Sequence, residues 1–313
     1  MPWILGVDEA GYGPNLGPLV QMAVAMRVPH VACNVWESLA EVVTKAKPKK
    51  RKDTRLIIDD SKAVYSSGDT LHRLERGLFA TMINGATTFD DVLTPIDHDL
   101  RQEMWFDGGA MVPIDLSMEE RQEWHARFSS ACACAELELG PVHGIVVNAP
   151  KFNAVVDRSG SKATVLADGL VSLLQSMRSS IPGTEPIFVY VDKQGGRNFY
   201  APLISTAFPD GWVNVVVEKA TESRYRVTGL EREIELLFTP RADGLHWTVA
   251  LASMGCKYLR EVCMKQFNQF WQSKVAGLKA TAGYPVDAVR FIGEIRTAIR
   301  EMQIDEATIW RKK

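Results

Sequence analysis

Two adjacent carboxylates, Asp8 and Glu9, stand in the stretch GVDEAGYGPNLGPLV (residues 6–20), which contains four glycines and two prolines. Successive side chains of a regular strand point to opposite faces, so these two acids can converge on one point only where the strand ends. Gly11 and Gly13 permit the backbone angles that such an end requires. These residues alone allow two interpretations: a functional acidic site, or an exposed strand end with two solvated acids.

A third carboxylate, Asp192, closes the apolar segment IFVYVD and is followed by KQGG. This pattern places Asp192 at the carboxyl edge of a sheet, where open sheets usually bind their ligands. Several carboxylates at one edge, without a histidine cluster, form an oxygen site suited to Mg²⁺ or Mn²⁺. Two such ions can hold the attacking water and the leaving oxygen of a phosphodiester displacement. The acids therefore predict a nuclease or another phosphoryl-transfer enzyme.

Apolar and alternating segments predict the elements that position these acids. Strands are expected at residues 3–8, 19–28, 56–58, 144–147, 187–192 and 212–217, with a hairpin formed by 224–229 and 233–240. Helices are expected from an N-cap at Asp69, from a capping box at residues 117–120, and over 164–177, 247–271 and 286–302. Strands first joined by turns and later separated by helices predict a mixed sheet with helices on its faces.

Composition narrows the class of protein. With 313 residues and a net charge of -2, the chain can bury a large core and has no overall basic character. The basic run at residues 45–55 is either a solvated loop or a phosphate contact. Five cysteines without a zinc-type spacing favour a reducing compartment, and no leader or apolar span is evident, so the cytoplasm is the expected location.

Four ordered segments resemble the type 2 ribonucleases H, the family of bacterial ribonuclease HII and the eukaryotic catalytic subunit. GVDEAGYGPNLGPLV is similar to that family's opening strand and its DEAGRG motif, and residues 60–62 are similar to its DSK segment. VDKQGG resembles the third acidic strand end, and ADGLHWTVALASMGCKYLRE (residues 242–261) resembles the family's helical block. Residues 84–130 and 224–240 lie outside the resemblance and are interpreted as insertions.

The resemblance implies an α/β fold, a ribonuclease H-like mixed sheet flanked by helices. A single catalytic domain would span residues 1–313, with a helical C-terminal portion over about 262–313. The implied activity is metal-dependent cleavage of the RNA strand of RNA–DNA hybrids, or cleavage at ribonucleotides embedded in duplex DNA, leaving 5′-phosphate and 3′-hydroxyl ends. Mg²⁺ or Mn²⁺ would be held by the implied catalytic residues Asp8, Glu9, Asp192 and Glu261. A monomer is expected, and no protein partner is indicated.

Five further residues are implied substrate contacts: Gly11, Tyr12, Gly13, Lys62 and Tyr284. Two positions depart from the family pattern, because Tyr12 replaces the usual arginine and Glu261 replaces the usual aspartate. These departures leave open a weak or inactive nucleic-acid-binding protein with the same fold. An ATPase of the actin and sugar-kinase type is a further alternative, although Glu9 would repel the phosphate that such a protein binds.

Overall fold

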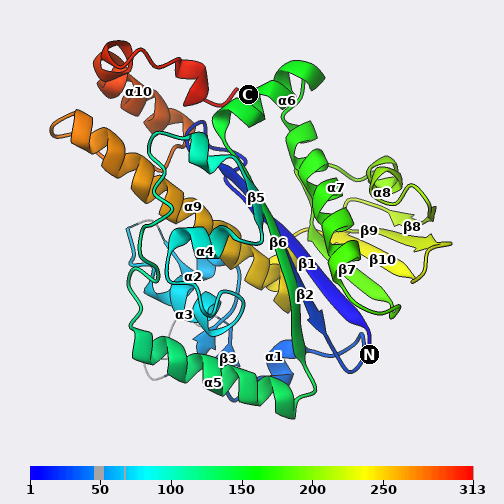
Figure 1. Ribbon diagram of the computed structural model, residues 1–313. Helices are drawn as coiled ribbons and strands as arrows, with labels where there is room; N and C mark the ends of the chain where they lie inside the picture. The colour runs from blue at the N-terminus through cyan, green and yellow to red at the C-terminus, as the bar shows by residue number, and fades with distance from the viewer. Residues whose placement is uncertain (46–52, 67, 313) are drawn as a thin grey trace.

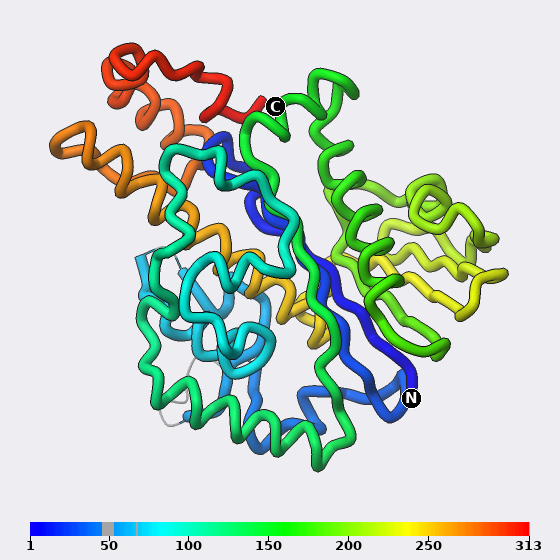
Figure 2. Tube along the Cα trace, viewed as in Figure 1, coloured from blue at the N-terminus to red at the C-terminus, as the bar shows by residue number. Residues whose placement is uncertain are grey.

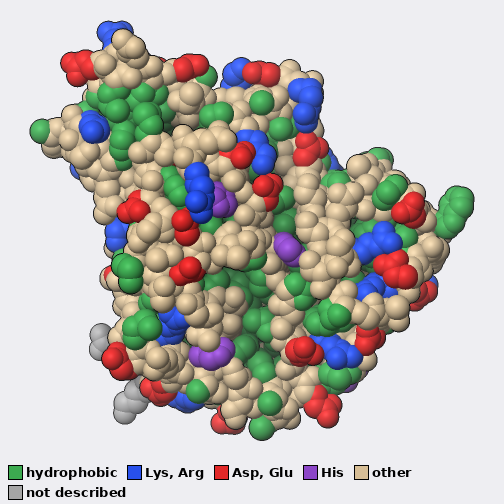
Figure 3. Space-filling model, in the orientation of Figure 1, with side chains coloured by type: hydrophobic (Ala, Val, Ile, Leu, Met, Phe, Trp, Pro, Cys, Tyr) green, Lys and Arg blue, Asp and Glu red, His purple; other side chains and the backbone are tan. Residues whose placement is uncertain are grey.

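The computed structural model describes residues 1–45, 53–66 and 68–312 (Figure 1). Most of the basic run predicted at 45–55 lies outside the described residues, which include only Lys45 and residues 53–55 of it. None of the helices in the described part of the chain is long and apolar enough to cross a membrane. On the face shown in Figure 3, acidic and basic side chains are interspersed rather than gathered by sign.

An eight-stranded mixed sheet forms the centre of the molecule, as the sequence predicts. Its two middle strands, β1 and β7, run parallel, and β1 pairs antiparallel with β2 on its other side. In spatial order, the strands are β5 (Ile96–His98), β6 (Glu138–Val147), β2 (Leu19–Arg27), β1 (Trp3–Ala10), β7 (Ile187–Asp192), β10 (Ile234–Thr239), β9 (Ser223–Thr228) and β8 (Trp212–Glu218). A separate pair comprises β3 (Val43–Thr44) and β4 (Leu56–Ile57).

Helices cover both faces of the sheet (Figure 1). One face packs against α3 (His72–Ala80), α5 (Met118–Cys134) and α9 (Trp247–Lys274). The other packs against α6 (Ala149–Ser159), α7 (Ala163–Ser180) and α8 (Ala201–Ala207). The alternation of β1 explains both cores, since Ile4 belongs to the first and Leu5 to the second. A third cluster joins α9 to α10 (Pro285–Glu301), which confirms the helical C-terminal portion.

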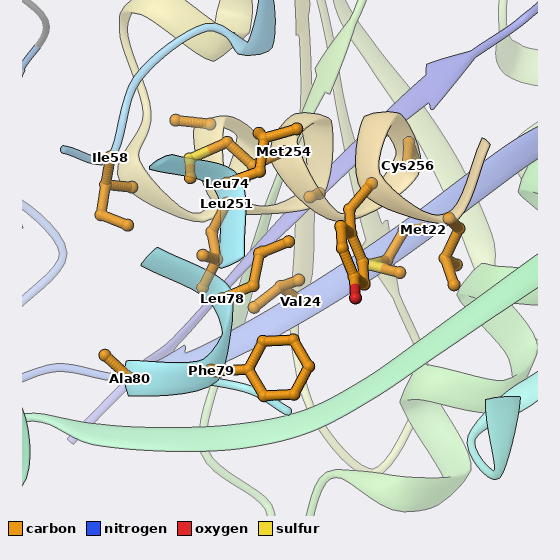
Figure 4. Packing of buried hydrophobic residues seen from close by; sticks show 14 of the residues in the cluster. Met22, Val24, Ile58, Leu74, Leu78, Phe79, Ala80, Leu251, Met254 and Cys256 are labelled. Atoms are coloured by element: carbon orange, nitrogen blue, oxygen red, sulfur yellow. The ribbon is translucent and has the colours of Figure 1, made fainter. Parts of the chain in front are cut away.

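The first core is dense because long apolar side chains from three layers interdigitate. Figure 4 shows this packing between β2, α3, α9 and the segment after β4. The labelled residues are Met22, Val24, Ile58, Leu74, Leu78, Phe79, Ala80, Leu251, Met254 and Cys256. The α9 backbone comes very close to β1, because a Cβ on Gly6 would lie only 2.2 Å from Thr248. Glycine at position 6 therefore allows α9 to lie directly on the central strand.

Several predicted elements differ in detail. Asp69 is not the N-cap of α3, which follows Leu71; the Asp69 carboxylate instead accepts a hydrogen bond from the Ser66 amide. The capping serine of α5 is confirmed, since Ser117 Oγ accepts from the amide of Glu120. Residues 84–116 contain α4 (Phe89–Leu93) and the edge strand β5. The remaining short helices are α1 (Val35–Ser38) and α2 (Ser61–Val64).

Residues 224–240 supply β9 and β10, and β10 pairs directly with β7. The predicted hairpin is confirmed, and its two strands belong to the main sheet. Helices α6 and α8 were not predicted. Each is short and begins with a proline in its first turn, a signal that from sequence alone is hard to separate from a loop.

Candidate active site

The register of the two middle strands brings Asp8 and Asp192 together. Val7 lies opposite Val191 in the parallel pair, so Asp8 and Asp192 follow side by side at the carboxyl ends of β1 and β7. Both belong to the strand face that α9 covers, because they alternate with the two valines on the opposite face. The predicted convergence of these two acids is therefore a consequence of strand register.

Burial and mutual repulsion perturb the first two acids. Asp8 is only 6% exposed. Its burial, and then the charge of Glu9, raise its pKa well above the ordinary value, while a hydrogen bond with Ser253 on α9 opposes the shift. Burial, and then the charges of Asp192 and Asp243, raise the pKa of Glu9 to about 7, against the lowering effect of Lys62. The charges of both acids act together with Asp192, although β1 does not end at them as expected but continues in register with β2 through Ala10.

Asp192 and Asp243 extend this acidic group. Asp192 Oδ1 accepts a hydrogen bond of 3.0 Å from the amide of Ala242, which ties the turn before α9 to the end of β7. Burial, and then the charges of Asp60 and Asp192, raise the pKa of Asp243 to about 6. We call Asp8, Glu9, Asp192 and Asp243 the acidic cluster. It draws its members from three segments that are far apart in the sequence.

Glu261, the fourth predicted ligand, lies elsewhere on α9. It is two turns beyond Ser253, or about 12 Å along the helix axis. Its Oε1 accepts from Lys257 Nζ at 2.5 Å, and its Oε2 accepts from the Tyr65 hydroxyl at 3.1 Å. The structure therefore does not bring Glu261 to the other three acids, and Asp243 takes that place. The signal for Asp243 was its position in a short acidic turn directly before the long helix.

The glycine-rich turn between β1 and β2 has two glycines with a positive φ, Gly11 and Gly17, and one, Gly13, that is open. Gly11 has a φ of +88°, and a Cβ there would lie 2.6 Å from the Pro18 carbonyl oxygen, so glycine is required. Gly13 has no positive φ, and nothing lies within 4 Å of where its Cβ would be. Gly13 therefore contributes an exposed stretch of backbone rather than an unusual angle. Among the described residues, the amides of Tyr12 and Gly13 have no hydrogen-bond partner.

Two buried arginines hold this turn from inside the protein. Arg260 on α9 donates to the carbonyl oxygens of Leu16 at 3.1 Å and Ala282 at 3.0 Å, and also to that of Pro18. Arg311 donates to Gly11 O at 2.6 Å and also to the Pro14 carbonyl oxygen. Neither guanidinium has an ion pair with a carboxylate in the described part of the chain. The turn is thus fixed through its carbonyl groups.

The other predicted substrate contacts lie around the same turn. Gly283 O accepts from the amide of Asn15 at 2.8 Å, which places Tyr284 beside the turn with 59% of its surface exposed. Lys62, in the first turn of α2, lies close enough to the acids that its charge lowers the pKa of both Glu9 and Asp192. All five predicted contacts therefore lie at the turn or at the acidic cluster.

Two cations near Tyr12 were missed by sequence reasoning. Lys162 Nζ lies 4.8 Å from the centre of the Tyr12 ring. Arg197, in the segment after Asp192, lies 5.8 Å from the Tyr200 ring and acts on the pKa of both tyrosines. Each residue is an ordinary surface cation in its own segment, so only the fold reveals their shared neighbourhood.

The donor chemistry of the acidic cluster fits a hard divalent cation. Its members are all carboxylates, which are the donors that Mg²⁺ and Mn²⁺ prefer. Their raised pKa values show that buried negative charge is left without sufficient compensation. Within the described residues, no three histidine, cysteine or acidic side chains form a ready-made metal site. The carboxylates would therefore have to draw closer around an ion, as repelling charges do when a cation is added.

Similarity to known proteins is found among solved structures. No protein-family model and no curated protein matches the sequence. The chain is similar to the ribonuclease H2 from Pyrococcus horikoshii OT3, with 15% identity and a TM-score of 0.46, over 98% of this chain and 92% of that one. It is also similar to the RNase HII from Archaeoglobus fulgidus, solved in a complex with PCNA, with 13% identity and a TM-score of 0.45, over 99% and 94%. Bst-RNase HIII in complex with Mn²⁺ gives 16% identity and a TM-score of 0.44, over 99% of this chain and 66% of that one.

Proposed function

We propose that this chain is a divergent member of the type 2 ribonuclease H family and a metal-dependent endonuclease. The observation that supports this most directly is the acidic cluster at the carboxyl ends of β1 and β7. The motifs DEAG, DSK and VDKQGG all belong to segments that reach this cluster. One buried and three partly buried carboxylates at that edge are suited to binding divalent cations and contribute little to stabilising the fold.

Asp8, Glu9, Asp192 and Asp243 would hold Mg²⁺ or Mn²⁺. When bound, two such ions supply stabilisation for the attacking water and for the leaving 3′-oxygen of a phosphodiester. The chain's own residues orient the ligands: the Ser253 hydroxyl, which donates to Ser61 Oγ at 3.1 Å, lowers the pKa of Asp8, and the Ala242 amide donates to Asp192. We assign Asp243, rather than Glu261, as the fourth ligand, because both oxygens of Glu261 already accept hydrogen bonds.

The substrate we propose is the RNA strand of an RNA–DNA hybrid, or a ribonucleotide embedded in duplex DNA. The free amides of Tyr12 and Gly13, with the exposed ring of Tyr284 nearby, offer donors and a stacking surface to a sugar. A 2′-hydroxyl is the group that would distinguish RNA from DNA there. Cleavage would leave a 5′-phosphate and a 3′-hydroxyl. We place this activity in a reducing cellular interior, since all five cysteines are free.

Cleavage assays test the proposal. Purified protein should cut a labelled RNA–DNA hybrid, or a duplex with one ribonucleotide, when Mg²⁺ or Mn²⁺ is added, and a chelator should stop the reaction. Asp8→Asn should lower turnover by about a thousandfold or more, because it removes a metal ligand. Folded protein that cuts neither substrate with either ion would refute the proposal. Binding without cleavage would instead favour the inactive nucleic-acid-binding alternative.

A matched pair of variants tests the ligand assignment. Asp243→Asn should reduce turnover as severely as Asp8→Asn, whereas Glu261→Gln should change turnover by less than about threefold, since Gln can still bond to Tyr65. Both changes are isosteric. Asp243 lies in the turn just before α9, and Glu261 lies in the middle of that helix. A severe loss in Glu261→Gln together with an active Asp243→Asn would reverse the assignment.

A further inference from the structure

Two cationic side chains near Tyr12 have no role in the function proposed above. The family motif usually has an arginine there, and this chain has an aromatic ring that cannot bind phosphate by charge. Yet Lys162 at the start of α7 extends over that ring, at 4.8 Å from its centre. Arg197, from the segment after Asp192, lies on the other tyrosine of this region, 5.8 Å from the Tyr200 ring. Positive charge is therefore present around Tyr12 although position 12 itself has none.

We propose that Lys162 and Arg197 bind phosphate groups of the nucleic-acid backbone beside the acidic cluster, and that Tyr12 is the platform that holds Lys162 in place. The inference rests on the proposed function and names the cations that replace the missing arginine. The ligand is a phosphodiester of the substrate strand, adjacent to the one that is cut.

The donors of both cations are free. Neither Lys162 nor Arg197 has an ion pair or a side-chain hydrogen bond with any residue that the structure describes. By contrast, the neighbouring Lys193 donates to Asn198 Oδ1 at 2.9 Å and to the Lys219 carbonyl oxygen. An aromatic ring attracts a cation through its face without using any N–H donor. An ammonium on Tyr12 therefore keeps three donors for a phosphate, and a guanidinium keeps five.

The two cations also lie at the right place. Tyr12 is close enough to Glu9 for that charge to raise its pKa further after burial, and Arg197 acts on the same ring in the opposite direction. Tyr200 is perturbed by both Glu9 and Asp192. Lys162 and Arg197 therefore lie beside the acidic cluster, while the charge of Lys62 acts directly on Glu9 and Asp192. Phosphates recur at short intervals along a strand, so a scissile phosphate at the cluster brings its neighbours toward such flanking charges.

The test is the salt dependence of binding. The dissociation constant of a fluorescein-labelled RNA–DNA hybrid is measured by anisotropy over a salt series, in chelator so that nothing is cut. Each phosphate contact contributes about 0.9 to the slope of log affinity against log salt. Lys162→Met and Arg197→Met should each lower the slope by about 0.9, and the double variant by about 1.8. A purely structural role of either side chain would not change this slope.

Tyr12 is tested by two substitutions. Tyr12→Phe keeps the ring and should show the wild-type slope of log affinity against log salt. Tyr12→Ala should lower that slope by as much as Lys162→Met does. Arg178→Met is the matched control, because Arg178 lies on the same helix about 24 Å beyond Lys162 and is paired with Glu231. Its slope should equal that of the wild type. Thermal melting confirms that each variant is folded, as expected for partly exposed side chains.

The outcomes separate this inference from the proposed function. An unchanged slope in the double variant overturns the inference, even if the wild type cuts its substrates. A lowered slope in protein that does not cut any substrate supports the phosphate contacts and refutes the enzyme. Wild-type protein that binds neither the hybrid nor a duplex with one ribonucleotide overturns the inference, whereas the proposed function is decided by the cleavage assay. A Tyr12→Phe variant that loses slope, or a Tyr12→Ala variant that keeps it, overturns the platform role of Tyr12.

Discussion

At the scale of single residues, the acidic cluster makes the stability of the metal-free protein depend on pH. Burial and neighbouring charges raise the pKa of Glu9 from 4.5 to about 7. A carboxyl group whose folded-state pKa is raised contributes full stability below its unfolded pKa, and this stability is lost as the pH rises through the folded-state value. The free energy of unfolding of the metal-free protein should therefore fall between about pH 4.5 and pH 7 on account of this group.

Glu9→Gln tests this dependence on pH. At about pH 8 in chelator, the variant should have a free energy of unfolding roughly 1 to 3 kcal/mol above that of the wild type, because it removes a partly buried charge beside Asp192 and Asp243. Urea denaturation at about pH 8 and pH 4 provides the measurement. The advantage should vanish at the lower pH, where Glu9 is protonated. An equal difference at both pH values would contradict the electrostatic cause.

Metal addition gives a second measurement that does not depend on catalysis. Mn²⁺ or Mg²⁺ in excess over its dissociation constant should raise the wild-type melting temperature, since an ion that binds only the folded protein stabilises it. Asp243→Asn should weaken this rise and Glu261→Gln should preserve it, because the Glu261 oxygens bond to Lys257 and Tyr65 instead. An unchanged response in Asp243→Asn would remove that residue from the proposed ligand set.

The sequence singled out three acids near strand ends, which the fold brings to one edge, and one acid on a helix, which it does not bring there. Asp8, Glu9 and Asp192 lie in the last residues of two strands that begin with apolar runs, and the carboxyl ends of such parallel strands meet at a predictable edge. Asp243 lies in a single turn between β10 and α9, where no sequence periodicity indicates which way its side chain points. Glu261 was predicted from its place in a helical motif. Successive side chains of a helix point in different directions around its axis, and the Glu261 side chain points to Tyr65.

At the scale of elements, the start of α9 is held by an aromatic stack that responds to pH. His246 precedes the first turn and stacks on Tyr190, with ring centres 3.8 Å apart. Burial, and then the charge of Lys45, lower the pKa of His246 from 6.5 to about 4. The unfolded chain therefore takes up a proton more readily than the folded one, and folding is disfavoured as the pH falls from about 6.5 to about 4.

His246→Phe isolates this contribution, because it keeps a ring on Tyr190 and removes the titration. Urea denaturation of the wild type and the variant is compared at about pH 7 and pH 4. The wild type should lose roughly 2 kcal/mol relative to the variant over this interval, a value reduced for the solvent that reaches the ring. A constant difference between the two proteins would show that His246 does not titrate as its burial implies.

The segment 305–312 contacts the glycine-rich turn on its buried side. Asn153 on α6 donates to the carbonyl oxygens of Ala307 and Trp310 and accepts from the Lys312 amide. Figure 2 shows this segment, in red, returning beside the start of α6 and the blue turn after β1. It delivers Arg311, which is 1% exposed, to the carbonyl oxygens of that turn. The segment has no apolar periodicity, so sequence patterns could not predict its path.

Arg311→Met should destabilise the protein by about 2 to 4 kcal/mol, because it leaves the buried carbonyl oxygens of Gly11 and Pro14 without donors. Lys312→Met is the control, since among the described residues its ammonium pairs only with the exposed Asp157, a pair that should contribute less than about 1 kcal/mol. Urea denaturation gives both values. Equal stability of the two variants would mean that the turn is held without Arg311.

At the scale of the whole molecule, local patterns predicted which segments are strands but not their neighbours. The hairpin of β9 and β10 was recognised from alternation, yet its pairing with β7 depends on a contact between segments about 47 residues apart. The same holds for β5, which joins β6 from inside a stretch that was interpreted as an insertion. Which strands pair over long range is decided by packing against both helical layers. Short windows of sequence carry no information about that packing.

The free edge of the sheet has a consequence for handling the protein in solution. Within the part of the chain that the structure describes, β8 pairs only with β9, and it exposes Trp212, Val215 and Val216 at 76%, 52% and 58%. Such an edge can accept a strand from another molecule, and a net charge of -2 offers little repulsion between copies. Light scattering of concentrated protein should therefore rise with time and fall when Trp212 is replaced by lysine. Any assay of nucleic-acid binding is best run in the dilute range where this self-association is slow.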